Sequence, residues 1–292
     1  MADFILFLFE KKLSLPCIQG YRSMLSAVFR WKVPEIASSP VIRDLLRSFT
    51  VQRPVSGISP PCWDLTKVLG TLRGAPFEPL VEATFRDLTK KTLFLVSLVT
   101  ARRVGELQAL SAKVTRVGGD MSLAYLPGFV AKTESASNPL PRSFLLKSLR
   151  DFVGNLEEEY LLCPVRALKF YLDRTKDLSP RPPNLFVSPR CRNHPLSKNA
   201  LSFFLRETIS GAGAAGAEEG PSPRAHSIRG VSTSLAFVKN WSVRDVLKAA
   251  TWRSNNFFAS FYLKDVMYIW DSSYSLGPYV AAGQVLHSSF QS

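Results

Sequence analysis

A histidine and an arginine near the end of the chain have the types and spacing of a phosphate-binding pair. His226 and Arg229 are three residues apart, and Ser222-Pro223 before them is typical of a helix start, a capping serine followed by proline. Residues three apart share one face of a helix, and the unpaired N–H groups at a helix N-terminus favour a phosphate. The pattern predicts an anion site at the first turn of a helix, although a structural surface pair has the same spacing.

A second charged group ends a strongly apolar helical segment that we predict over 88–110. The group reads ARRVGEL and contains Arg102, Arg103 and Glu106. An arginine in such apolar surroundings needs a partner, because an unpaired buried guanidinium is costly. Glu106 follows Arg103 by about one helical turn and is its expected partner. Two interpretations stay open: a buried ion pair that joins two helices, or an arginine held in place for an anionic ligand.

The overall charge favours a polyanionic partner. The 292 residues include 37 Lys+Arg and 23 Asp+Glu, which gives a formal net charge of +14. Such an excess is typical of proteins that bind nucleic acid or an anionic membrane surface, and it also occurs on a merely solvated surface. With 46% hydrophobic and 21% charged residues, the composition is that of an ordinary globular protein. It excludes bulk disorder, a collagen-like repeat and a disulfide scaffold.

The sequence predicts neither a membrane segment nor a metal site. The early apolar run Phe4–Phe9 is far shorter than the ~20 residues of a spanning helix, and Asp3 before it does not fit a signal peptide. The cysteines lack a C-x-x-C pair, as expected of reduced thiols. Cys191 and His194 have C-x-x-H spacing without a second ligand pair. We expect no metal, no cofactor and no small-molecule substrate.

A short linker divides the chain into two regions. Residues 53–62 are rich in proline, glycine and serine, and we interpret them as an interdomain linker. A helical region over 1–52 precedes the linker, and a larger domain over 63–270 follows it. The last residues, 271–292, form a C-terminal tail in this interpretation.

Periodicity predicts a mainly helical fold with a small β-sheet, in the α+β class. In the first region, a helix over 14–34 would bury a stripe formed by Tyr21, Leu25 and Val28. In the larger domain the pattern changes to short strands, and helices follow them. We predict strands at Leu123–Tyr125, 129–131 and 144–146, and turns at Gly118-Gly119 and Pro127-Gly128. We predict helices over 157–174, with a break near Pro164, and over 243–250, and a further helix that begins at Pro223.

Taken together and in chain order, these motifs resemble the tyrosine recombinase family. The family pattern is R-x-x-E-L, a lysine in a β-hairpin, H-x-x-R, a histidine or tryptophan, and a nucleophilic tyrosine. The matching residues are Arg103 with Glu106 and Leu107, Lys132, His226 with Arg229, Trp252, and Tyr262. The resemblance covers about residues 63–285 and is specific only in combination. The tail segment 276–282, LGPYVAA, is more similar to recombinases of DIRS-like eukaryotic retrotransposons.

The resemblance implies metal-free cleavage and rejoining of DNA through a 3′-phosphotyrosine. Tyr262 would be the nucleophile, and cationic neighbours would favour its phenolate, since an unperturbed phenol has a pKa of ~10. Arg103 and Arg229 would clamp the non-bridging oxygens of the scissile phosphate, a task that suits guanidinium groups. His226 would donate a hydrogen bond to the phosphate or transfer the tyrosine proton, and Lys132 would protonate the departing 5′ oxygen. Trp252 would pack behind the tyrosine and donate its indole N–H to a phosphate oxygen.

Several features depart from the family or have simpler explanations. Trp252 and Tyr262 are ten residues apart, one more than in most bacterial and phage members, so Tyr268 is the alternative nucleophile. Arg102 is the alternative to Arg103 as the first catalytic arginine. The region before the linker is short for the family's core-binding domain, which fits a fragment or a decaying copy. Tyr262 lies among phenylalanines, where a tyrosine is more often part of the core, and a loop lysine is usually just solvated.

We therefore expect an enzyme of DNA recombination and integration that acts on double-stranded DNA for a mobile element, in the nucleus if the eukaryotic resemblance holds. Family analogy implies a homotetramer on DNA, with the segment 274–286 docking on a neighbouring subunit. The alternative is a catalytically inert DNA-binding protein that derives from such an element and keeps its fold. A basic scaffold for acidic proteins is a third reading, and it leaves the ordered motifs unexplained. Steep salt dependence of binding would separate the first two from the third.

Overall fold

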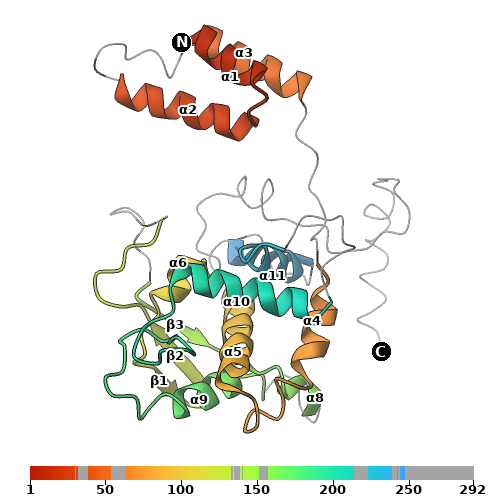
Figure 1. Cartoon of the computed structure of the whole chain (residues 1–292), viewed down its shortest axis with the longest axis vertical. Coiled ribbons are helices and arrows are strands. Elements are labelled where there is room, and N and C mark those ends of the chain that lie inside the picture. Colours follow the sequence, from red (N-terminus) through yellow and green to blue (C-terminus); the bar gives the residue numbers. More distant parts are fainter. Residues whose placement is uncertain are drawn as a thin grey trace. The chain divides into compact units, whose positions relative to one another are not determined.

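The computed structural model describes residues 1–29, 31, 39–53, 63–132, 134, 139, 141–150, 157–213, 223–238, 242 and 244–246. These residues belong to two compact units, Met1–Gly57 and Ile58–Ser292, which are described separately (Figure 1). The boundary between the units falls inside the segment 53–62 that we interpret as a linker. The predicted tail over 271–292 lies outside the described residues.

In its described part, the first unit consists of helices around a small apolar core. They are α1 (Ala2–Glu10), α2 (Leu15–Val28) and α3 (Pro40–Gln52). Both α2 and α3 carry a proline in the first turn, where the backbone N–H would have no helical partner in any case. All the helices contribute to the core, which contains Ile5, Leu8, Phe9, Leu15, Ile18, Ile42, Leu46 and Phe49.

The stripe predicted on α2 is wrong. Tyr21 and Val28 are 37% and 63% exposed, and the helix buries Leu15 and Ile18 instead. Only the start of α2 faces the core that α1 and α3 supply, so the later turns leave apolar side chains on the surface. The run Phe4–Phe9 is helical, as expected within the helical region over 1–52, although Phe4 and Phe7 are exposed.

The second unit is built around helix α5 (Phe85–Thr100). The apolar side chains of Leu88, Leu93, Phe94 and Val96 are 0% exposed. They are covered because neighbouring helices pack on α5, namely α9 (Pro164–Asp173), α10 (Lys198–Gly211) and α11 (Ser227–Val238). The remaining helices of the described part are α4 (Leu65–Leu72), α6 (Val104–Gln108) and α8 (Glu157–Tyr160).

A small antiparallel sheet packs against α5, which confirms the predicted class of a mainly helical protein with a small β-sheet. Its strands are β1 (Thr115–Val117), β2 (Asp120–Ala124) and β3 (Ser143–Leu146), in the order β1-β2-β3. In the register of the central pair, Leu123 lies opposite Phe144. The strands around Leu123 and over 144–146 are therefore confirmed.

The connections of the sheet agree with the sequence in part. The turns predicted at 118–119 and 127–128 are confirmed, whereas the strand predicted over 129–131 is wrong. The Phe129 N–H donates to the Leu126 carbonyl at 3.2 Å, and the Phe129 carbonyl accepts from the Arg142 guanidinium at 2.8 Å. These backbone groups close a turn and bind a side chain, so they do not pair with a strand.

The apolar segment predicted as one helix over 88–110 is divided into α5 and α6. Helix α5 ends at Thr100, and Ala101 adopts a left-handed conformation with a φ of 48°. This conformation costs an L-residue about 1–2 kcal/mol, so the surrounding packing must impose it. The break places Arg102 and Arg103 between two helices. The helix predicted over 157–174 is also interrupted, and Pro164 begins α9 as expected.

The described residues contain neither a candidate membrane span nor a candidate metal-binding cluster. No helix among them is long and apolar enough to cross a membrane. No group of three or more His, Cys, Asp or Glu side chains among the same residues could hold a metal ion. Cys191 Sγ lies 3.2 Å from His194 Nδ1 on the surface.

Candidate active site

The buried carboxylate of Glu106 lies at the centre of the candidate site. The side chain belongs to α6 and is 2% exposed. Its Oε1 accepts a hydrogen bond from Arg103 Nη1 at 3.0 Å, and its Oε2 accepts from the Arg103 backbone N–H at 3.3 Å. The same Oε2 lies 3.9 Å from Arg102 Nη1 and 3.9 Å from Arg229 Nη1. One carboxylate therefore gathers guanidinium groups from two distant parts of the chain.

The neighbouring arginines Arg102 and Arg103 have different surroundings. The side chain of Arg103 is 25% exposed, and it caps the start of α6 through Glu106. The side chain of Arg102 is 7% exposed, and its guanidinium carbon lies 4.4 Å from the ring centre of Phe144 on β3. Among the described residues, Nε and Nη1 of Arg102 have no hydrogen-bond partner. Of the two arginines, Arg103 is the one that reaches solvent.

Arg229 is positioned by α11, which side-chain hydrogen bonds hold against the rest of the unit. The Ser227 hydroxyl accepts from Trp63 Nε1 at 2.8 Å. Further along the helix, the Ser232 hydroxyl donates to the Leu98 carbonyl of α5. Arg229 itself is 2% exposed. Trp63 thus helps to orient Arg229 through its hydrogen bond to Ser227. The sequence does not predict this role, because Trp63 and Ser227 lie far apart in the chain.

The structure corrects the predicted surroundings of His226. Helix α11 begins at Ser227 and not at Pro223, because the Ser227 N–H and hydroxyl both donate to the Arg224 carbonyl, at 2.9 and 2.6 Å, and close a turn there. His226 lies in this turn and is exposed, whereas Arg229 lies in the first helical turn and is buried. The prediction that both side chains share one helical face is therefore wrong.

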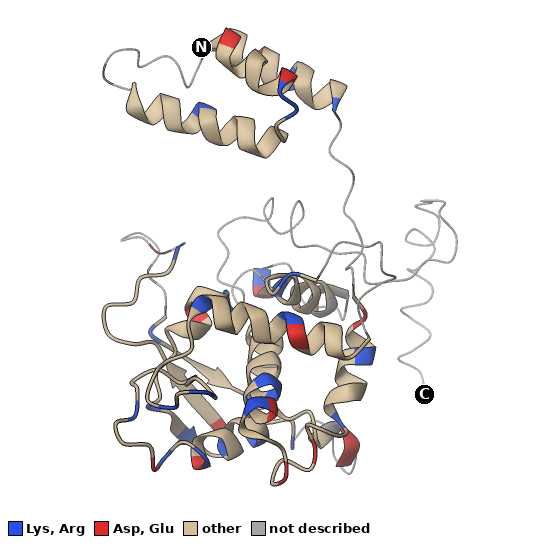
Figure 2. Cartoon of the chain, in the orientation of Figure 1, with Lys and Arg blue, Asp and Glu red and all other residues tan. Residues whose placement is uncertain are grey.

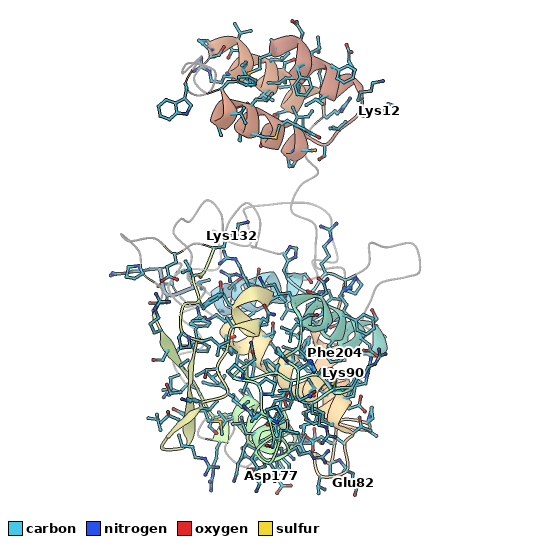
Figure 3. The ribbon with its side chains drawn as sticks, turned by 60° about the vertical axis from the view of Figure 1, so that its left-hand side comes forward. Lys12, Glu82, Lys90, Lys132, Asp177 and Phe204 are labelled. Atoms are coloured by element: carbon cyan, nitrogen blue, oxygen red, sulfur yellow. The ribbon has the colours of Figure 1, made fainter. Side chains whose placement is uncertain are left out.

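Lys132 lies in the connection between β2 and β3, the place predicted for it between two strands, and it is exposed. Figure 3 places Lys132 at the same end of the second unit as α6 and α11. Glu134 stabilises the loop beside it, because its carboxylate accepts from the Ala131 N–H at 3.0 Å and from Arg142 Nη2 at 2.6 Å. The structure thus brings this lysine to the end of the unit that carries the arginine cluster.

Tyr125 is a member of the cluster that the sequence analysis missed. Burial raises the pKa of Tyr125 to about 12, while the nearby charges of Arg102 and Arg229 lower it and that of Glu106 raises it. Its hydroxyl oxygen is buried without a hydrogen-bond partner among the described residues. The alternation of apolar residues along β2 predicts that this side chain points inward, but not that it meets arginines.

Within the described part, the structure brings together Arg103, Glu106 and Arg229. Lys132 and His226 are exposed. Trp252, Tyr262 and the alternative nucleophile Tyr268 lie outside the described residues. Basic residues occur on most elements of the second unit (Figure 2). Guanidinium groups held near one carboxylate can bind an anion, because their forked N–H groups match the oxygens of a phosphate.

Comparison with known proteins gives matches among solved structures alone. No protein-family model matches the sequence, and no curated protein is significantly similar to it. Lambda integrase (residues 75–356), in a dimer bound to a COC′ core site, matches with a TM-score of 0.52 and 18% identity over 94% of this chain and 81% of that one. XerH site-specific recombinase, in a post-cleavage complex with a palindromic difH substrate, matches with a TM-score of 0.57 and 16% identity over 98% of this chain and 69% of that one. This chain therefore has the fold of the tyrosine recombinases.

Proposed function

We propose that this chain is a tyrosine recombinase, which cleaves and rejoins double-stranded DNA in recombination or integration. One observation carries the proposal: Arg103 and Arg229, which are far apart in sequence, converge on the carboxylate of Glu106. Guanidinium groups held in this way can bind the two non-bridging oxygens of one phosphate. The fold supports the proposal, since both similar proteins named above are bound to a DNA core site or substrate in their structures.

In the proposed reaction, the hydroxyl oxygen of Tyr262 attacks the scissile phosphorus, the bond to the 5′ oxygen breaks, and a 3′-phosphotyrosine forms. His226 accepts the tyrosine proton or bonds the phosphate, and Lys132 donates a proton to the departing 5′ oxygen. Arg103 and Arg229 stabilise the charge that develops on the phosphate. The phosphotyrosine keeps the energy of the original bond, so a 5′-hydroxyl can attack it and rejoin a strand without ATP.

The proposal assigns the first catalytic arginine to Arg103 and not to Arg102. The side chain of Arg103 reaches solvent, from where a DNA phosphate arrives, whereas that of Arg102 is covered by Phe144. Arg102 then adds positive potential behind the phosphate, which acts over a longer range than a hydrogen bond. Trp252 is assigned to packing behind Tyr262 and to an indole N–H bond with the phosphate.

The proposal extends to the source and assembly of the protein. The tail segment 276–282 is similar to recombinases of DIRS-like retrotransposons, which supports a eukaryotic mobile element and action in the nucleus. We also propose a homotetramer on DNA, joined through the segment 274–286. The matched lambda integrase structure is a dimer on its core site, which supports the binding of more than one copy to DNA.

The second candidate function is a catalytically inert DNA-binding protein with the same fold. One observation favours it: Arg229 is 2% exposed and lies beside Glu106, so a phosphate must compete with an internal carboxylate to reach it. An inert protein would keep the arginine as part of a buried ion pair.

Cleavage of supercoiled plasmid tests the proposal without knowledge of a target site. The full chain, its Tyr262→Phe variant and its Tyr268→Phe variant are incubated with plasmid in EDTA and quenched with detergent. Covalent adducts and relaxed plasmid are then measured. We expect adducts from the parent and from Tyr268→Phe, and none from Tyr262→Phe, because the phenylalanine variant lacks the attacking oxygen.

Other outcomes of this experiment separate the alternatives. Adducts that persist in Tyr262→Phe and disappear in Tyr268→Phe would move the nucleophile to Tyr268. The inert DNA-binding protein would be favoured by salt-sensitive DNA binding without covalent adducts. For this outcome, no form of the protein would give adducts on plasmid or on DNA that carries the ends of the cognate element.

A further inference from the structure

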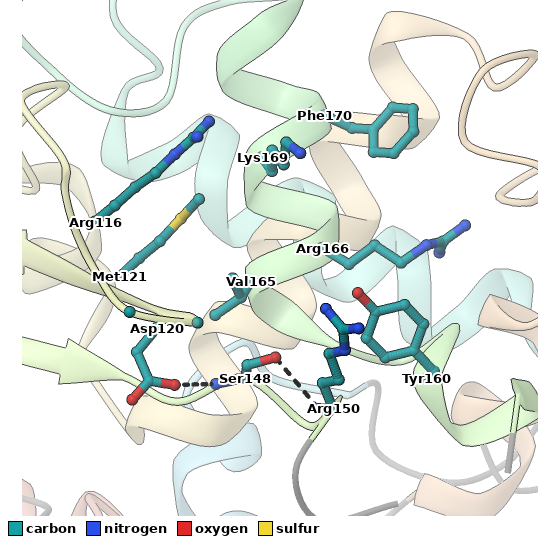
Figure 4. A pocket seen from close by; sticks show the side chains of 12 residues that line it. Arg116, Asp120, Met121, Ser148, Arg150, Tyr160, Val165, Arg166, Lys169 and Phe170 are labelled. Atoms are coloured by element: carbon teal, nitrogen blue, oxygen red, sulfur yellow. Dashed lines mark hydrogen bonds between the residues drawn. The ribbon is translucent and has the colours of Figure 1, made fainter. Parts of the chain in front are cut away.

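The second unit contains a cationic pocket apart from the arginine cluster. The pocket has a volume of about 340 Å³ and lies between the β1–β2 turn, the residues after β3 and one face of α9 (Figure 4). In Figure 1, β1 and α9 lie at the opposite end of the second unit from α6 and α11. The basic residues that line the pocket are Arg116, Arg150, Arg166 and Lys169. The proposed DNA cleavage does not use any of them.

Among the described residues, most of the basic side chains around this pocket form no ion pair. Arg166 is held by Glu78, whose carboxylate oxygens accept from Nη1 and Nη2 at 2.6 and 3.0 Å. Arg116, Arg150 and Lys169 are exposed, and they form no ion pair within the part of the chain that the structure describes. Like charges around a hollow repel one another, and an anion placed between them relieves this repulsion.

The acidic residue of the lining, Asp120, does not neutralise these cations. Its Oδ1 accepts from the Ser148 N–H at 2.8 Å, as Figure 4 shows, and its Oδ2 accepts from Lys147 Nζ at 2.9 Å. These hydrogen bonds hold the pKa of Asp120 below its ordinary value. The carboxylate is thus ionised and already bonded at one edge of the pocket, so it leaves the other side chains available to a ligand.

The shape and composition of the pocket favour a small phosphorylated ligand. Guanidinium and ammonium groups together suit phosphoryl oxygens, since the former bind in a forked manner and the latter as point charges. A volume of this size fits a small molecule and not a DNA duplex. Tyr160 and Phe170 place aromatic rings beside Arg166, on one side of the pocket (Figure 4). These rings can contact a flat group that is attached to the phosphates.

We propose that this pocket binds a small anion with two linked phosphoryl groups, either free pyrophosphate or the diphosphate of a nucleotide. Arg150 and Lys169 bind the phosphoryl oxygens, and Arg116 adds a positive charge across the pocket. The proposal is independent of DNA cleavage, because the pocket lies apart from Arg103 and Arg229.

Calorimetric titration of the full chain with inorganic pyrophosphate, at low ionic strength and without divalent metal, tests this proposal. The double variant Arg150→Gln/Lys169→Gln removes two exposed charges from the pocket. We expect it to raise the Kd by about tenfold or more, because each substitution removes a charge-assisted hydrogen bond. The matched control Lys67→Gln/Arg206→Gln removes two exposed charges on α4 and α10, and we expect its Kd to stay within about twofold of the parent value.

A third variant separates this pocket from the arginine cluster. Because a phosphate can also bind at Arg103, the pocket is tested in the Arg103→Gln background, where Arg150→Gln/Lys169→Gln should cause the same loss of pyrophosphate binding. Loss of binding in Arg103→Gln but not in the pocket variant would overturn the proposal, as would equal losses in the two double variants. A pocket variant that weakens duplex DNA binding, with no pyrophosphate binding by the parent, would also overturn it, because the pocket would then be a DNA contact.

Titration with ADP identifies the source of the two phosphoryl groups. ADP that binds more tightly than pyrophosphate, with the same loss in Arg150→Gln/Lys169→Gln, would support a nucleotide whose base contacts Tyr160 or Phe170. ADP that binds more weakly than pyrophosphate would support free pyrophosphate as the ligand.

Discussion

Glu106 links α6 to α11, because its Oε2 lies 3.9 Å from Nη1 of Arg229 while its Oε1 accepts a hydrogen bond from Arg103. The side chains of Glu106 and Arg229 are each 2% exposed, so water screens their attraction little. In the free protein the carboxylate offsets part of the positive charge and keeps the arginines oriented. A phosphate that binds there meets side chains already held in place, which lowers the cost of ordering them.

Replacing this carboxylate by an amide should destabilise the protein. Glu106→Gln keeps the shape of the side chain but leaves guanidinium groups without their counter-charge, which costs about 2–4 kcal/mol in the free energy of unfolding. Chemical denaturation of the full chain measures this loss. Asp44→Asn is the control, since the side chains of Asp44 and its partner Arg43 are 69% and 73% exposed, and we expect it to lose less than about 1 kcal/mol. Equal losses in the two variants would contradict the central position of Glu106.

The two adjacent arginines should respond differently to the same substitution. Arg103→Gln should reduce adduct formation on DNA by about 10²–10³-fold, because it removes a donor to the developing charge. It should also lower the Tm, because it removes a charged hydrogen-bond partner of the buried Glu106 carboxylate. Arg102→Gln should retain most adduct formation, since its side chain is covered by Phe144. Quenched adduct assays and thermal unfolding of both variants provide the comparison. A larger loss of adducts in Arg102→Gln would reverse the assignment.

Local sequence patterns predict much of this fold and little of how the parts meet. Hydrophobic periodicity predicts the small sheet, and the fixed backbone preference of proline predicts the start of α9. The break between α5 and α6 does not follow from them. Ala101 has the highest helix propensity of any residue type, and tertiary packing alone places it in the left-handed region.

The same limit applies to the candidate site. Motif spacing singles out Arg103 and Arg229, and it pairs Arg103 with Glu106. It does not predict the Trp63–Ser227 hydrogen bond, because that bond joins segments whose contact depends on the whole fold. Motif spacing does not predict the start of α11 either. The turn before this helix is closed by hydrogen bonds from Ser227 to the Arg224 carbonyl, which the capping rule for Ser222 does not describe.

A second charged network should make the stability of the unit depend on pH in the acid range. Glu78 accepts hydrogen bonds from Arg166 and from the fully buried Lys91. Burial alone would raise the pKa of Glu78, but these hydrogen bonds outweigh it and hold the pKa below the ordinary value of 4.5. The folded protein thus binds this proton less readily than the unfolded chain. The stabilisation is complete above pH 4.5 and is lost as the pH falls through the lower folded value.

The variant Glu78→Gln tests this dependence. It leaves the ammonium group of Lys91 buried without a counter-charge, so we expect a loss of about 3–5 kcal/mol near neutral pH and a smaller change in Tm between pH 6 and pH 3 than in the parent. Glu82→Gln, an exposed position nearby, is the control. Parallel Tm profiles for the parent and Glu78→Gln would exclude Glu78 as a source of the acid sensitivity.

The hydroxyl of Tyr125 should be dispensable for adduct formation, although this side chain lies within the arginine cluster. Its phenol is buried and has a pKa raised to about 12, so it stays neutral near pH 7 and cannot act as a phenolate. The hydroxyl has no hydrogen-bond partner among the described residues, and a buried polar group in that position lowers stability. Tyr125→Phe should therefore leave adduct formation intact and raise the unfolding free energy by up to about 1 kcal/mol. A large loss of adducts with unchanged stability would instead show that this hydroxyl takes part in the reaction at the arginine cluster.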